Sequence, residues 1–179
     1  SGLVGSETLG QSVSSTFSDK SVGTGKTVTV NSISLSDGSN GGLANNYSIS
    51  SGQTTTANIT AKSVTVSGIT ASNKTYDAAT SATVDVSSAS FSGIVSGDNL
   101  SVSASGVFDN ANVGTGKTVT LTSSYSGDDV NNYSITDQAS TTANVTQKAL
   151  TATASASNKS YDAATTATVT LTFSGLIGS

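Results

Sequence analysis

The strongest constraint on this chain is an internal repeat, because long motifs recur in the same order at nearly constant spacing. The recurring segments, each followed by its second copy, are Val22–Thr29 and Val113–Thr120, Asn45–Ile49 and Asn131–Ile135, and Ala71–Thr80 and Ala156–Thr165. The offset falls from 91 residues for the first pair to 86 for the second. The first copy therefore carries five extra residues, and the glycine-rich stretch 36–42 predicts a longer loop there.

The repeat places natural boundaries before Lys62 and Lys148. We expect one complete repeat over 62–147, the later strands of a preceding repeat over 1–61, and the opening strands of a following repeat over 148–179. The two ends of the chain also resemble each other, which favours a segment taken from a longer array.

Apolar and polar residues alternate with a period of two through most of the chain, and no stretch has a helical period. Clear examples are 64–67, 84–87, 100–105, 118–122, 142–146 and 150–154. Turn signals separate these runs at 96–99, 109–112, 114–116 and 126–129. About seven short strands in 86 residues predict an all-β fold of tandem immunoglobulin-like antiparallel β-sandwich repeats. Another small all-β repeat fold is the alternative.

One tyrosine in each copy supports the sandwich prediction. Tyr133 follows a short polar loop and precedes an alternating run, and Tyr47 repeats the pattern. This arrangement resembles the tyrosine corner of immunoglobulin-like domains, in which the hydroxyl group bonds to upstream backbone. We therefore expect structural roles for Tyr47 and Tyr133.

The composition excludes several function classes. The sequence has no His or Cys, so imidazole bases, thiol nucleophiles and common zinc sites are absent. The formal charge of −4 disfavours nucleic acid and anionic membranes as partners. No apolar run approaches the length of a membrane span. Few groups titrate near neutrality, so we expect stability to change little between about pH 5 and pH 8.

Candidate chemical motifs have simpler structural interpretations. Residues 23–27 and 114–118 contain Gly-Thr-Gly-Lys-Thr, but the first glycine of a phosphate loop is missing and a strand follows instead of a helix. Asp98, Asp128 and Asp129 are candidate ligands for Ca²⁺ near one end of a domain. Turn aspartates more often bond their own backbone. A lysine-to-asparagine isopeptide cross-link is a further alternative, and it needs contacts that a sequence does not show.

Several motifs in order resemble the YDG-type repeat of large bacterial surface and secreted adhesins, which include haemagglutinin-like exoproteins. They are Asn73–Thr80, Phe91–Asp98, Val113–Lys117, Asn132–Ile135 and Thr142–Thr146. In this alignment Tyr76 and Tyr161 are the family's tyrosines, and we expect them to be structural. Ala78 and Ala163 replace the expected glycine, so we expect a backbone there that needs no positive φ.

The resemblance implies an extracellular or cell-surface location and a non-catalytic role as the stalk, spacer or fibre segment of an adhesin, including biofilm fibres. We expect no enzyme activity and no cofactor apart from the Ca²⁺ candidate. The expected partners are neighbouring repeats of the same or identical chains. Two alternatives remain. One is a filament subunit joined head to tail by strand complementation. The other is a carbohydrate-binding module that takes surface glycans as partners.

Overall fold

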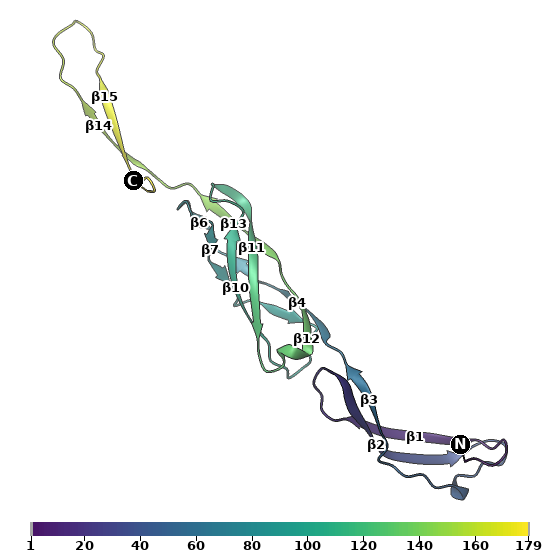
Figure 1. Ribbon diagram of the computed structural model, residues 1–179. Helices are drawn as coiled ribbons and strands as arrows, with labels where there is room; N and C mark the ends of the chain where they lie inside the picture. The colour runs from purple at the N-terminus through teal and green to yellow at the C-terminus, as the bar shows by residue number, and fades with distance from the viewer. Residues whose placement is uncertain (1, 179) are drawn as a thin grey trace. The chain divides into compact units, whose positions relative to one another are not determined.

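The structure, a computed structural model, describes residues 2–178 and consists of β-strands, loops and two 3-10 turns (Figure 1). No α-helix occurs in these residues, so the chain is an all-β protein. Neither 3-10 turn of the described chain has the length or apolar character needed to cross a lipid bilayer.

The strands are β1 Leu9–Phe17, β2 Gly23–Asp37, β3 Thr54–Ile59, β4 Lys62–Ser67, β5 Thr70–Ala71, β6 Lys74–Thr75, β7 Ser81–Ala82, β8 Val84–Asp85, β9 Ser90–Ser92, β10 Ser101–Phe108, β11 Gly114–Ser126, β12 Tyr133–Thr136, β13 Ser140–Thr146, β14 Thr151–Ala156 and β15 Val169–Ser174. The 3-10 turns are η1 Ala44–Asn46 and η2 Val130–Asn132.

The chain divides into two compact units. One comprises the residues up to Ser63 together with Asp129–Ser134, and the other comprises Val64–Asp128 and the residues from Ile135 onward. The division into three repeats at Lys62 and Lys148 stays a prediction.

The first unit is built on a three-stranded antiparallel sheet in the order β1-β2-β3. β1 pairs with β2 from Leu9 opposite Asp37 to Phe17 opposite Val28, with a bulge at Ser14 and Ser15. Every residue of these three strands is half-buried or exposed.

A five-stranded sheet in the order β6-β13-β11-β10-β7 forms the largest part of the second unit. The long strand β11 is central and pairs with β10 on one side and β13 on the other, as Figure 1 shows. The smaller sheets are β12-β4-β9 and β5-β8, and β14 pairs with β15 in a separate hairpin.

The core lies between strands that belong to different sheets. Val66 on β4 and Ile69 just after it pack with residues of the five-stranded sheet, where Phe108 is 2% exposed and Val119 is fully buried. The other buried members are Leu121, Ala143 and Val145. Along β10, β11 and β13 these positions alternate with residues that are more exposed, as the period-two pattern predicted for these strands.

Two local predictions were wrong. Residues 114–116 do not form a turn, because β11 begins at Gly114 and the pairing with β13 shifts register between Gly114 and Lys117. Gly116, at φ 60°, accommodates this bulge. Residues 62–147 contain ten strands instead of about seven, because β5, β6, β7 and β8 are two-residue pairings interrupted by turns.

The expected backbone at the family's glycine position was also wrong. Ala78 has φ 62° and Ala163 has φ 56°, so both adopt the left-handed conformation that favours glycine. Each alanine sits next to an aspartate whose carboxylate accepts the backbone N–H two residues further on. The hydrogen bond to the aspartate closes the turn and holds the alanine in its strained backbone conformation.

We predict that Ala78→Gly stabilises the protein by about 0.5–1 kcal/mol. The substitution removes a left-handed cost of about 1–2 kcal/mol, and the greater chain entropy of glycine offsets about 0.5–1 kcal/mol of it. Denaturant unfolding measures the change. Ala79→Gly in the same turn is the matched control, because Ala79 has no positive φ, and it should destabilise the protein. Equal losses in both variants would contradict the assignment.

Candidate functional site

Tyr47 ties the start of the first unit to the loop before β3. The turn η1 ends on Tyr47, whose backbone N–H donates to the carbonyl oxygen of Ala44 at 3.1 Å. Its hydroxyl group accepts a hydrogen bond from the Val4 N–H at 3.1 Å and donates to Glu7 Oε2. The bond to Glu7 raises the pKa of Tyr47 because the carboxylate favours the protonated phenol. This tyrosine therefore joins segments more than forty residues apart in the sequence.

Tyr133 occupies the equivalent place in the second copy. It follows η2, begins β12 and is 9% exposed. Asp98 stands where the first copy has Glu7, by the 91-residue offset. In the first copy, the acid at this repeat position, Glu7, accepts the hydrogen bond from the Tyr47 hydroxyl group.

Each of the two Tyr-Asp-Ala turns, at residues 76–78 and 161–163, is held by its own lysine. Lys74 Nζ lies 2.8 Å from Asp77 Oδ1 and donates to the carbonyl oxygens of Ala79 at 2.7 Å and Ser81 at 3.0 Å. The bond from Lys74 lowers the pKa of Asp77, and the N–H of Ala79 lowers it further. Lys74 also lies over the Phe108 ring, 5.4 Å from its centroid.

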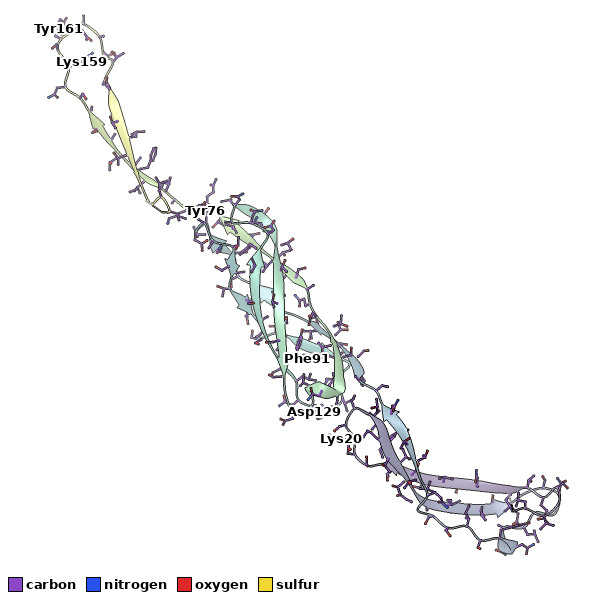
Figure 2. The ribbon with its side chains drawn as sticks, viewed as in Figure 1. Lys20, Tyr76, Phe91, Asp129, Lys159 and Tyr161 are labelled. Atoms are coloured by element: carbon purple, nitrogen blue, oxygen red, sulfur yellow. The ribbon has the colours of Figure 1, made fainter. Side chains whose placement is uncertain are left out.

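The second of these turns shares the bonds to the aspartate and to the second alanine but has a different environment. Lys159 Nζ contacts Asp162 Oδ1 and the Ala164 carbonyl oxygen, each at 2.8 Å, and the pKa of Asp162 is lowered mainly by Lys159. Figure 2 shows Lys159 and Tyr161 on the loop between β14 and β15. Tyr161 is 95% exposed, whereas Tyr76 is half-buried and packs against the core.

A third lysine position meets an aspartate near a strand start. Lys117 Nζ lies 2.7 Å from Asp109 Oδ1 and 2.8 Å from Asn110 Oδ1, and the first copy pairs Lys26 with Asp19. The hydrogen bond from Lys117 lowers the pKa of Asp109, because the ammonium group favours the charged carboxylate.

The Ca²⁺ candidates do not form a ligand group. Asp128 is exposed, Asp98 and Asp129 are half-buried, and residues 2–178 contain no cluster of three acidic side chains suited to a metal ion. The backbone carbonyl oxygen of Asp129 accepts the Asn132 N–H at 2.9 Å, which closes the turn η2.

Two polar contacts of the complete repeat escaped the sequence predictions. Gln138 brackets Ile69, since its Oε1 accepts the Ile69 N–H at 2.9 Å and its Nε2 donates to the Ile69 carbonyl oxygen at 2.7 Å. Tyr125 donates to Asp137 Oδ1 at 2.6 Å and packs edge-on against Phe91, with ring centroids 6.3 Å apart. In the sequence, the only sign of these contacts is the adjacent pair Asp137-Gln138, which stands in a region rich in Ser and Thr.

A family model described as the YDG domain matches residues 1–57 and 60–143. No curated protein and no solved structure matches the chain. The matched residues include both corner tyrosines and the first Tyr-Asp-Ala turn, but they end before the second one.

We predict that the free energy of unfolding falls at acid pH. Asp19, Asp77, Asp109 and Asp162 have pKa values below the ordinary 3.8, chiefly because each accepts a lysine hydrogen bond. Their contribution is fully present above the unfolded pKa and is lost as pH falls through the folded pKa. The free energy of unfolding should stay flat between about pH 5 and pH 8 and decline below about pH 4. A steep change near neutral pH would contradict this.

We predict that Tyr47→Phe loosens the first unit, because the phenyl ring can neither accept nor donate a hydrogen bond. The phenyl ring keeps the packing but gives up the bonds to Val4 and Glu7. Hydrogen exchange at the Val4 amide should become faster. Tyr161→Phe is the matched control, because that side chain is 95% exposed, and it should leave exchange unchanged.

Proposed function

The chain belongs to the YDG domain family, and from this membership we propose that it is a non-catalytic structural segment of a bacterial extracellular adhesin. In this role it acts as a stalk or spacer, made of tandem immunoglobulin-like β-sandwich repeats that hold a binding region away from the cell surface. The observation that carries the proposal is the recurrence of one three-stranded unit, since β1, β2 and β3 have the sequence positions and pairing order of β10, β11 and β13.

The architecture of the complete repeat supports a sandwich. Val66, from the three-stranded sheet, shares a core with Phe108 and Val119, from the five-stranded sheet. The central strand β11 pairs antiparallel with β10 and β13, and β4 pairs antiparallel with β9. Antiparallel sheets that share a core are a feature of immunoglobulin-like domains.

The links between successive repeats support a stiff spacer. Only Thr60 and Ala61 separate β3 from β4, and β14 begins five residues after Thr146, where β13 ends. Both links are short and contain no glycine, the residue that gives a linker the most conformational freedom.

The outer strand faces suit a passive role. Ser101 pairs with Ser126 and Ser103 with Ser124 through hydroxyl contacts of 2.8 Å across β10 and β11. These uncharged pairs keep the surface hydrated without a field that salt would screen. In each of the four lysine–aspartate pairs of the described residues, the aspartate lies in a loop outside the strands.

The carbohydrate alternative has less support. A sugar platform needs an aromatic face open to the ligand, and in this chain Tyr125 is half-buried, packed edge-on against Phe91 and bonded to Asp137. Tyr161 is open, but it stands alone on a loop.

We predict that adhesion by the producing bacterium depends on the length of this segment and not on its exposed side chains. Deleting the 86 residues 62–147 in frame from the natural protein should reduce adhesion of intact cells, and an unrelated rigid domain of the same length should restore it. Thr122→Ala, on an exposed position of β11, is the control and should have no effect.

A binding module would behave in the opposite way. Loss of adhesion in the domain-replacement strain, with surface display verified by antibody labelling of unpermeabilised cells, would overturn the spacer proposal. Labelling only after permeabilisation would overturn the proposed location.

A further inference from the structure

The start of β11 holds a lysine that is nearly buried although it carries a charge. The side chain of Lys117 is 9% exposed. Its Nζ lies 2.7 Å from Asp109 Oδ1 and donates to Asn110 Oδ1 at 2.8 Å. An amine nucleophile therefore contacts both an amide carbonyl group and a group that can carry its proton.

The local backbone brings these groups together. Gly114 has no side chain, and a Cβ added there would lie 3.1 Å from Lys117 Cδ, so the lysine stem passes closely over the first residue of the strand. The Asp109 N–H donates to the Thr118 carbonyl oxygen at 3.1 Å, which holds the turn 109–112 against β11. The lysine thus has little freedom to leave the turn.

The side-chain amide of Asn110 is placed as the electrophile. Its Oδ1 also accepts the Asn112 N–H at 3.0 Å, and this donor stabilises negative charge that develops on the oxygen during attack. Because Lys117 Nζ is 2.8 Å from this oxygen and a C=O bond is about 1.2 Å long, Nζ lies within about 4 Å of Cγ. A rotation about the Cβ–Cγ bond, whose torsional minimum is broad, turns the carbon toward the amine.

Asp109 can carry the protons of the reaction. In the resting pair both groups are charged, since the hydrogen bond from Lys117 lowers the pKa of Asp109. Transfer of one proton from the ammonium group to the carboxylate gives a neutral amine and a carboxylic acid, with no change in the net charge of the pair. Because the charged pair predominates, we expect a slow reaction that follows folding.

We propose that Lys117 and Asn110 form an isopeptide bond, with Asp109 as the proton carrier. The neutral Nζ attacks Cγ of Asn110, Asp109 gives its proton to Nδ2, and Asp109 then takes the proton that Nζ must lose. The Cγ–Nδ2 bond breaks and ammonia departs, taking the last proton as ammonium and restoring the carboxylate. No oxidant, reductant or other co-reactant is needed. The side chain of Asp109 is 48% exposed, so ammonia has a route to solvent.

The first copy has similar contacts without the same chemistry. The counterparts of Lys117, Asn110 and Asp109, by the 91-residue offset, are Lys26, Asp19 and Ser18. Lys26 is 11% exposed and contacts Asp19, whose Oδ1 accepts the Ser21 N–H at 2.9 Å. A carboxylate is a poor electrophile, and Ser18 cannot act as the acid. We therefore expect the bond in the second copy and not in the first.

The bond closes a ring across the bulge at the start of β11. It joins the turn 109–112 to the strand beyond Gly116, so the turn cannot separate from β11 unless a covalent bond breaks. This inference is independent of the stalk proposal, because the bond forms within one chain whatever that chain does at a cell surface.

Mass spectrometry of the full chain tests the proposal. After the folded chain has been kept at neutral pH, its intact mass should be lower by about 17 Da, the mass of one ammonia molecule. A tryptic map should show Asn110 and Lys117 in one cross-linked product, because trypsin does not cleave after a lysine whose Nζ is acylated. Asparagine also loses ammonia when it closes on its own backbone as a succinimide. Hydroxylamine opens that ring and leaves an isopeptide bond intact, so the mass loss should survive hydroxylamine.

Three substitutions assign the roles. Lys117→Arg keeps the positive charge but removes the amine, and it should retain the full mass. Asp109→Ser introduces the residue that the first copy has at this position, and it should also retain the full mass. Lys26→Arg is the matched control in the first copy, and it should lose one ammonia molecule as the parent chain does.

Transfer of the second copy's residues to the first copy is the positive test. Asp19→Asn alone supplies the electrophile without the acid, so the loss should stay at one ammonia molecule. Ser18→Asp combined with Asp19→Asn supplies both groups beside Lys26, and the loss should double to about 34 Da.

A parent chain that is folded by circular dichroism and keeps its full mass overturns the proposal. A mass loss that persists in Lys117→Arg, or that hydroxylamine reverses, overturns it as well, because such a loss comes from a succinimide. Mass loss in Asp109→Ser at the parent rate, or a double variant that loses only one ammonia molecule, overturns the role of Asp109.

Discussion

The structure depends on the burial of one apolar face that no single sheet of the repeat can cover by itself. Val119 is fully buried only because the opening residues of the repeat place Val66 and Ile69 against it. The strands of the first copy repeat several of the same motifs and pair in the same order, yet all their residues are half-buried or exposed. The hydrogen bonds between the strands set the shape of the sheet. The extent to which its apolar face is buried determines how much stability the sheet gains.

The charged groups of the lysine–aspartate pairs stabilise loops. The lysine–aspartate pairs have short contacts but exposed carboxylates, and exposed pairs contribute little stability by themselves. Their effect is conformational, because the aspartate also accepts a backbone N–H and the lysine also donates to carbonyl oxygens, as Asp77 and Lys74 do. The turn is held tightly enough for Ala78 to adopt a conformation that glycine would reach without strain.

The sequence predicted the parts of the fold that follow from periodicity. The alternation around Val66, Val119 and Val145 correctly predicted all-β structure and the buried faces, because side-chain direction in a strand depends only on position along it. It did not predict the breaks that divide the opening residues into β5 to β8, since two-residue pairings leave no periodic signal. The bulge at Gly116 was mistaken for a turn because both use glycine at positive φ. The two hydrogen bonds between the Gln138 side chain and the Ile69 backbone join residues 69 positions apart, and no local sequence pattern reveals such a contact.

The candidate site shows why equivalent sequences do not guarantee equivalent surfaces. Tyr76 and Tyr161 stand in nearly identical motifs with the same lysine-held turn, but the first is half-buried against a core and the second is 95% exposed. The local motif fixes the backbone in both copies, and the exposure of the ring depends on whether later strands of a repeat lie beneath it.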